Sequence, residues 1–287
     1  MPDLSSPAVA QDGGRAWPVG KRYDGGVHRV TAAQVDDYCA AIGDLRSSWA
    51  GPGAVAPPMF HARPMRDLLF AVMQDAELGL DFRLLLHAAH DASFHQPLRP
   101  GQAVTCRGEL RAVEEKPHGV RLVTRLWALC AGEIAVQADS VFFVRRAART
   151  GPVPSPRPEP PRPPPDLERP LVLAADQARR YASASGDDNP LHTDPGYARA
   201  AGLPDVIVHG LCTMALAGNV VVSALADSPA DDDPRRLRRL AVRWARPVHD
   251  GQALQVRIWR GPRGGRFEVV DAGGQAVITQ GIAELEG

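Results

Sequence analysis

The segment from Ser185 to His192, Ser-Gly-Asp-Asp-Asn-Pro-Leu-His, carries the side chains best suited to chemistry. It places a carboxylate, Asp187, five residues before an imidazole, His192, and Pro190 between them favours a turn over a continued helix. A carboxylate and an imidazole held close together can bind a water molecule and transfer its protons. The alternative interpretation is an ordinary surface turn, because Gly, Asp, Asn and Pro are common in turns.

A second polar pair, His209-Gly210, comes directly before the apolar run Leu211–Ala226. This run predicts a buried helix, and the first N–H groups of a helix have no partner inside it. The N–H of Gly210 could therefore stabilise an oxyanion. The alternatives are that Gly210 allows close packing of the helix on a sheet and that His209 is structural. Taken together, these groups could add water to an α,β-unsaturated thioester or remove it.

These residues belong to the second of two similar halves. Tyr38–Asp44 matches Tyr181–Asp187 at an offset of 143 residues, and Pro97–Gln102 matches Pro247–Gln252 at an offset of 150. Both halves also end on a strand pattern that begins with glycine. Because the matches follow the same order in each half, we predict two copies of one domain.

A proline-rich tract separates the halves. Residues 151–170 contain ten prolines, which excludes a helix or a central strand and favours an extended linker over a ligand for an SH3-type domain. We therefore predict a disordered N-terminal lead at 1–16, a first domain at 17–150 and a second domain at 171–287.

Each half shows the same order of predicted elements, beginning with a capped helix after Thr31 or Asp176. A longer apolar helix follows, and then strands with alternating apolar residues. The predicted long helices and strands are Pro64–Gln74, Ala103–Val113, Val120–Cys130 and Glu133–Val144, then Leu211–Ala226, Leu240–Trp244, Ala253–Arg260, Arg266–Asp271 and Ala276–Leu285. This order predicts an α+β fold in which an antiparallel sheet wraps around one long apolar helix in each half.

The bulk composition excludes several classes of protein. A chain of 287 residues that is 44% hydrophobic can form a large core, and its net charge of zero gives no indication of nucleic acid or an anionic membrane as partner. No apolar run is long enough to cross a membrane, and the N-terminus lacks the features of a secretion signal. We therefore expect a cytoplasmic protein whose four cysteines are structural thiols.

Three consecutive motifs in the second half resemble the signature of the MaoC-like dehydratases, which include the (R)-specific enoyl-CoA hydratases. These motifs are Tyr181–Pro195, Ala198–Leu203 and Val208–Thr213. Trp17–Arg146 resembles, more weakly, the non-catalytic repeat of the double-hotdog members of this family. The resemblance implies a double hotdog, in which two curled sheets each wrap a central helix and pair side by side.

The resemblance also implies roles for the matching residues. Asp187 and His192 match the catalytic pair that holds the water. Asn189 matches a residue that orients this pair, and Gly210 matches the backbone oxyanion donor. The implied reaction is syn addition of water to a trans-2-enoyl-CoA, giving an (R)-3-hydroxyacyl-CoA. It implies no metal or redox cofactor, and coenzyme A is part of the substrate. The alternatives are a dehydratase acting on acyl carrier protein and a non-enzymatic acyl-CoA-binding module.

The first half departs from the motif. Asp44 is present, but Trp49 stands where a histidine would be, and Ala56–Phe60 stands near the place of the His-Gly pair. We therefore predict that this half has lost catalysis, completes the sheet and helps to hold the acyl chain.

A basic run follows the second apolar helix. Arg235, Arg236 and Arg243 are candidates for binding the phosphates of coenzyme A, or an acyl carrier protein, because arginine matches phosphate geometry. With His209, they complete the predicted substrate-binding residues. The alternative is a solvated charge run that balances Asp231–Asp233, and strand alternation could place Arg243 on the opposite face from Trp244. We expect a homodimer, although a chain with two hotdogs could also act as a monomer.

Overall fold

The computed structural model describes residues 16–44, 46, 49, 51, 53–81, 84–146, 163–228 and 231–286. The predicted N-terminal lead, apart from its last residue, and residues 151–162 of the predicted linker lie outside the described residues. The described strands are β1 (Arg22–Arg29), β2 (Leu85–Phe94), β3 (Ala103–Lys116), β4 (Gly119–Cys130), β5 (Glu133–Arg145), β6 (Leu167–Val172), β7 (Leu237–Trp244), β8 (Ala253–Gly261), β9 (Gly264–Asp271) and β10 (Ala276–Leu285).

These strands form one antiparallel sheet with the order β1-β3-β4-β5-β2-β7-β10-β9-β8-β6. The first five strands in this order come from the first half of the chain, and the last five come from the second half in reversed order. The halves meet where β2 pairs with β7, with Asp91 opposite Ala241. The sheet therefore consists of two equivalent units, which confirms the predicted α+β architecture.

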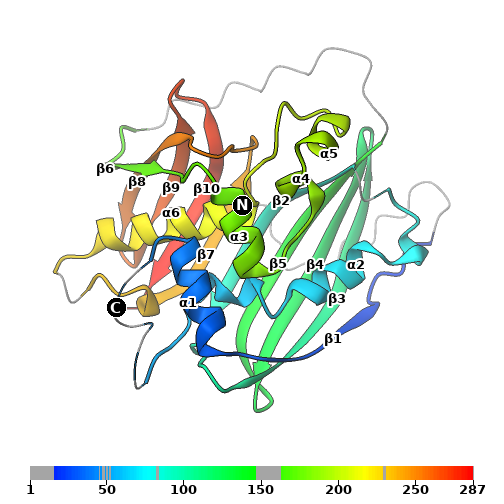
Figure 1. Cartoon of the computed structure of the whole chain (residues 1–287), viewed down its shortest axis with the longest axis horizontal. Helices are drawn as coiled ribbons and strands as arrows, with labels where there is room; N and C mark the ends of the chain where they lie inside the picture. The colour runs from blue at the N-terminus through cyan, green and yellow to red at the C-terminus, as the bar shows by residue number, and fades with distance from the viewer. Residues whose placement is uncertain are drawn as a thin grey trace.

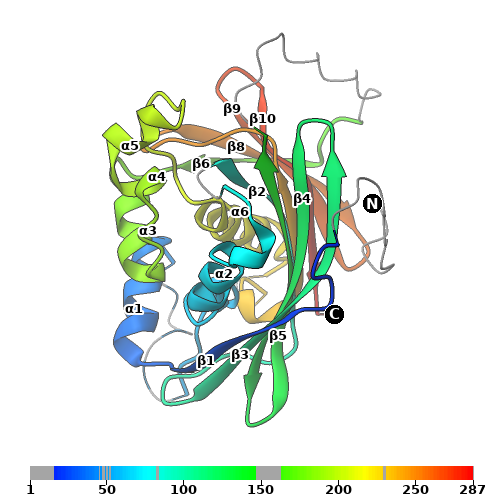
Figure 2. The same cartoon turned by 90° about the vertical axis from the view of Figure 1, so that its right-hand side faces the viewer.

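The helices lie on one face of the sheet in two layers (Figure 1; Figure 2). The inner layer holds α2 and α6, which contact the strands of the first and second half respectively. The outer layer holds α1 and α3, which lie side by side, followed by the short helices α4 and α5. The helices are α1 (Ala32–Ala41), η2 (Pro58–Ala62), α2 (Arg66–Met73), η3 (Ala76–Leu78), α3 (Gln177–Ser185), α4 (Pro190–Thr193), α5 (Pro195–Ala200), α6 (Gly210–Leu225) and η5 (Pro234–Arg236).

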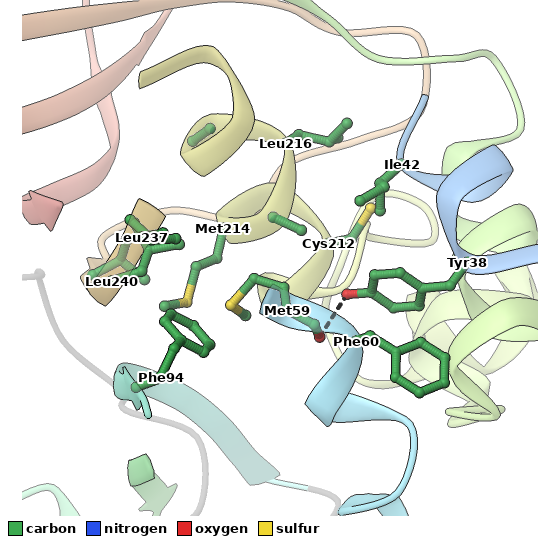
Figure 3. Packing of buried hydrophobic residues seen from close by; sticks show 14 of the residues in the cluster. Tyr38, Ile42, Met59, Phe60, Phe94, Cys212, Met214, Leu216, Leu237 and Leu240 are labelled. Atoms are coloured by element: carbon green, nitrogen blue, oxygen red, sulfur yellow. Dashed lines mark hydrogen bonds between the residues drawn. The ribbon is translucent and has the colours of Figure 1, made fainter. Parts of the chain in front are cut away.

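The main core is one cluster of buried residues that runs through both halves. Met59, from η2, and Met214, from α6, are both buried there and point toward one another (Figure 3). Tyr38 and Tyr181 are equivalent residues of α1 and α3, and both are fully buried. The Tyr38 hydroxyl donates to the Met59 carbonyl at 2.8 Å, so the contact between the two tyrosine oxygens, at 3.3 Å, has Tyr181 as donor. The halves are therefore joined by packing and by an internal hydrogen bond.

The predicted linker is wrong at its end, because β6 begins at Leu167, inside the range 151–170. Pro170 lies within this strand, opposite Gln255 of β8. A proline lacks the N–H of an interior strand, but β6 is the last strand of the sheet and needs partners on one side only. The predictions also missed β1 and β2 entirely.

The predicted caps differ in their chemistry. Thr31 forms a reciprocal capping box with Gln34 at the start of α1. Asp176 stands at the cap position of α3, but its carboxylate pairs with Arg180 and caps no N–H.

The cysteines and the length of the helices bear on two further expectations from the sequence. All four cysteines are buried and unpaired. Among the described residues, no helix has the length and apolar character needed to cross a membrane.

Candidate active site

The turn after α3 presents Asp187. Helix α3 ends at Gly186, whose φ of 76° lies in the left-handed region that favours glycine. The Ser185 hydroxyl accepts the N–H of Asp187 at 3.2 Å, and Asp187 Oδ1 accepts the N–H of Asn189 at 3.3 Å. Asn189 in turn caps α4 by accepting the N–H of Leu191 at 3.1 Å. The predicted orienting residue therefore touches the predicted acid directly.

His192, in the short helix α4, has one nitrogen committed and one available. Its Nδ1 lies 2.7 Å from the carbonyl oxygen of Ile207, and a carbonyl can only accept, so Nδ1 carries the proton. Its Nε2 is therefore an acceptor in the neutral ring. Burial lowers the pKa of His192, and the nearby charge of Asp187 opposes this shift only in part. The imidazole is thus neutral near pH 7 and can accept a proton.

His209 stands between the two predicted catalytic residues. Its ring stacks on His192 with centroids 3.6 Å apart, and its Nε2 donates to the carbonyl of Asp187 at 2.9 Å. Burial lowers the pKa of His209 well below its usual value. His209 is 2% exposed and contacts both predicted catalytic residues, and its role in binding substrate stays a prediction.

The three side chains form one cluster. Asp187, His192 and His209 each have a ligand atom within 4.8 Å of the others. A water molecule that donates both hydrogens bridges acceptors roughly 4.5 Å apart, so a carboxylate and an imidazole nitrogen at about this separation can share one water. A metal ion fits less well, because ring lone pairs lie in the ring planes and these two planes are stacked at 26°.

Gly210 is the first residue of α6. The N–H groups of Cys212 and Thr213 donate to the carbonyl of His209, whereas the N–H of Gly210 has no partner among the described residues. A Cβ at Gly210 would lie 2.8 Å from the ring of Trp244 on β7. The glycine therefore allows the helix to pack on the sheet, and its N–H has no partner among the described residues, so oxyanion binding stays a prediction.

The predicted phosphate-binding arginines do not join this cluster. Arg235 pairs with Asp233, and Arg236 pairs with Asp231 at 3.1 Å, beyond the opposite end of α6. Arg243 is exposed on the outer face of β7, while Trp244 faces α6, as strand alternation allows. The ion pairs of Arg235 and Arg236 match the interpretation of a charge run that balances nearby acids, and the phosphate-binding role stays a prediction.

The sequence analysis missed a histidine in the first half. His61 lies in η2, five residues before the first residue of α2, whereas His209 is the residue immediately before α6. It stands 148 residues before His209, between the two repeat offsets, and this spacing was the available signal. The residue after it is Ala62 rather than glycine, so no His-Gly pair marked the position.

His61 takes part in a buried chain of hydrogen bonds. Its Nδ1 donates to the carbonyl of Pro58 at 3.0 Å, which makes its Nε2 an acceptor. The Nε2 of His90 therefore donates to it at 3.1 Å, and the hydroxyl of Ser140 donates to His90 Nδ1 at 2.9 Å. Both ring nitrogens of His61 and of His90 are therefore hydrogen-bonded.

The residues of the first half that correspond to Asp187 and His192 are also buried. Asp44 is 3% exposed and pairs with Arg46, and Trp49 is 3% exposed in the core. Within the described ranges, the second half holds the one cluster of three acids and histidines close enough to share a ligand.

Known families match the two halves of the chain separately. Residues 157–280 match the family described as MaoC like domain, and residues 18–132 match the FAS1-like dehydratase domain region. The chain is 30% identical over 214 residues to the mouse peroxisomal multifunctional enzyme type 2, covering 72% of this chain but only 28% of that enzyme.

In two further comparisons, the match covers most of the related protein as well as most of this chain. A Mycobacterium tuberculosis protein named 3-hydroxyacyl-thioester dehydratase Y is 30% identical over 214 residues, which span 70% of this chain and 72% of that protein. The crystal structure of a MaoC-like dehydratase from Phytophthora capsici superposes with a TM-score of 0.76 at 22% identity, covering 93% of this chain and 95% of that one. The fold is thus a double hotdog, and the chain belongs to the MaoC-like dehydratase family.

Proposed function

We propose that this chain reversibly adds water to a trans-2-enoyl-CoA, giving an (R)-3-hydroxyacyl-CoA. The observation that carries the proposal is that Asp187 and His192 each offer an atom to a cluster whose members lie within 4.8 Å of one another, while Nδ1 of His192 is held by the carbonyl of Ile207. Gly210, whose N–H has no partner among the described residues, is the first residue of α6 and follows His209 of the cluster. The relative named as a 3-hydroxyacyl-thioester dehydratase supports a thioester as substrate.

In the hydration direction, Asp187 and His192 Nε2 accept the two hydrogens of one water, which leaves an oxygen lone pair for the β-carbon. One O–H bond of the water breaks as its oxygen bonds to that carbon, and the pair takes the released proton. The α-carbon then receives a proton from the same pair, so the net change is addition of H and OH.

The thioester oxygen gains negative charge while the β-carbon is attacked. The N–H of Gly210 can donate to this oxygen, and the helix dipole of α6 favours negative charge at the same end. This step requires that the N–H of Gly210 is not already hydrogen-bonded within the protein, and it has no partner among the described residues.

The role of the first half belongs to the same proposal. We assign it no catalytic turnover, since its counterpart residues Asp44 and Trp49 are buried and its His61 is fully hydrogen-bonded. It completes the sheet and supplies η2 to the core beside α6.

Four expectations belong to the proposal and await their own tests. The reaction needs no metal or redox cofactor, so a chelator should leave the rate unchanged. The homodimer is checked by sedimentation, the cytoplasmic location by fractionation, and the carrier by comparing one acyl chain on coenzyme A and on acyl carrier protein.

The test is the loss of enoyl absorbance when the protein meets crotonyl-CoA or a medium-chain trans-2-enoyl-CoA. We expect rapid loss, and the product should be oxidised by an (R)-specific but not by an (S)-specific 3-hydroxyacyl-CoA dehydrogenase. No loss with either thioester, or with the same chains on acyl carrier protein, would overturn the proposal.

A further inference from the structure

An arginine of the first half contacts the helix that leads into the active-site turn. Arg63, at the end of η2, donates from Nη1 to the carbonyl oxygens of Ser183 at 3.2 Å and Ala184 at 2.8 Å. These carbonyls belong to the last turn of α3, where the helix has no internal donors for them and where its dipole favours a cation. The guanidinium also lies 3.5 Å from the place where a Cβ on Gly186 would be.

A second arginine of the first half contacts the other side of the same turn. Arg66, in the first turn of α2, donates from Nη2 to Asp188 Oδ1 at 2.9 Å and pairs with Asp67 at 2.7 Å. Its guanidinium lies over the ring of Phe70, 4.3 Å from the centroid, which fixes its direction. Asp188 is the residue directly after Asp187, so the two arginines hold the chain before and after the predicted acid.

We propose that Arg63 and Arg66 are positioning residues for Asp187, through which the first half sets the geometry of the active site in the second half. The inference rests on the proposed hydration reaction. Neither arginine is among the contacts of Asp187 or His192 themselves, so they act through the backbone on either side of the acid. A shift of about 1 Å in a reacting group can lower a rate roughly 100-fold, so a loose turn would be costly.

The two contacts differ in strength. Arg63 makes two hydrogen bonds to backbone carbonyls that have no other donor in the helix, and the shorter of them, to Ala184, is partly buried. The carboxylate of Asp188 is 78% exposed, and solvent screens its pair with Arg66. We therefore expect Arg63 to have the larger effect.

The experiment compares R63A, R63K and R66A with the wild type, using R121A as the matched control. Arg121 is an arginine of the same half with similar exposure, and its partner is Glu114, on the neighbouring strand. The kcat and KM for crotonyl-CoA are measured together with amide hydrogen exchange over residues 186–192. We expect R63A to lower kcat roughly 10- to 100-fold with little change in KM, and R66A to lower it only a few-fold. Partial activity in R63K, and recovery of R63A in dilute guanidinium, would identify the missing contact.

The exchange measurement separates this inference from the proposed function. In R63A, the amides of Asp187, Asn189 and His192 should exchange faster than in the wild type, while R121A should match the wild type. Wild-type exchange over this segment in R63A would overturn the positioning role, whether or not the protein hydrates enoyl-CoA. A change in KM without a change in kcat in R63A would also overturn the positioning role. So would a fall of kcat in R121A equal to that in R63A.

Discussion

Each half of the molecule places a buried histidine ahead of its inner helix, His61 five residues before α2 and His209 immediately before α6, but the two histidines have opposite surroundings. In the first half, both nitrogens of His61 are hydrogen-bonded, to Pro58 and His90. In the second half, His209 stacks on His192, and its Nδ1 is buried without a partner among the described residues.

The residues next to the two histidines also differ between the halves. Gly210, with its free N–H, follows His209, while Ala62 follows His61 inside a 3-10 helix. His192 corresponds to Trp49, which is buried in the core. Around the two histidines, the first half holds a fully paired chain of hydrogen bonds, whereas the second half leaves an N–H and a ring nitrogen without partners among the described residues. The contrast is local to these histidines, because the first half also holds buried polar atoms without a hydrogen bond, among them Asp44 Oδ2 and Trp49 Nε1.

The largest contrast is expected between H192A and H61A. Removing His192 takes away one of the two acceptors for water, so we expect kcat to fall roughly 100- to 10,000-fold in a folded protein. Removing His61 leaves His90 without its acceptor and should cost about 1–3 kcal/mol of unfolding free energy. Rates of enoyl-CoA hydration and urea unfolding curves measure the two effects. Similar losses of rate per folded molecule in both variants would contradict the division between the halves.

A smaller contrast separates packing from oxyanion binding within α6. In G210A the new Cβ would meet Trp244 at 2.8 Å, and in G218A it would meet Leu240 at 2.8 Å. Both variants should lower the melting temperature, but G210A should also lower kcat roughly 100-fold or more because it displaces the helix start. If kcat falls equally in both, the free N–H of Gly210 contributes nothing beyond packing.

The smallest effect is on the pH dependence of stability. Burial lowers the pKa of His61 to about 4 and that of His87 to about 3. In the unfolded chain both titrate near pH 6.5, so as pH falls below that value the unfolded state binds protons that the folded state excludes. The free energy of unfolding should therefore fall by up to about 1.4 kcal/mol per pH unit for each histidine.

Urea unfolding between about pH 7 and pH 5 measures this slope. The variant H61Q, whose amide does not titrate, should show a shallower slope than the wild type. A free energy of unfolding that stays constant over this range in the wild type would contradict the neutral hydrogen-bond chain through His61.

Much of the fold could be predicted because its elements carry regular patterns. Strands β4, β5 and β8 and the apolar helix α6 follow the expected periodicity within a few residues. Strand β2 was missed because its buried positions include His90, which no apolar pattern identifies, and its partner β7 comes from the other half of the chain. Strand β6 was missed because Pro170 argues for a linker unless the strand is known to be at an edge.

The site could be predicted only as a set of candidates. The turn chemistry of Gly186 and Asn189 was readable because those residues act on their own neighbours. The support by Arg63 and the stacking of His209 on His192 depend on segments far apart in the chain. The ion pairs of Arg235 and Arg236 with nearby acids are likewise visible only in the structure, and the phosphate-binding role of these arginines stays a prediction.

The most direct test of the account is the rate of crotonyl-CoA hydration in D187N measured beside D44N. Asp187 and Asp44 are equivalent residues of the two halves, and the account places the reaction in the second half alone. D187N should lower the rate roughly 100- to 10,000-fold, while D44N should keep a near-normal rate per folded molecule. Near-normal hydration in D187N, or an equal loss in D44N, would contradict a single active site built on Asp187.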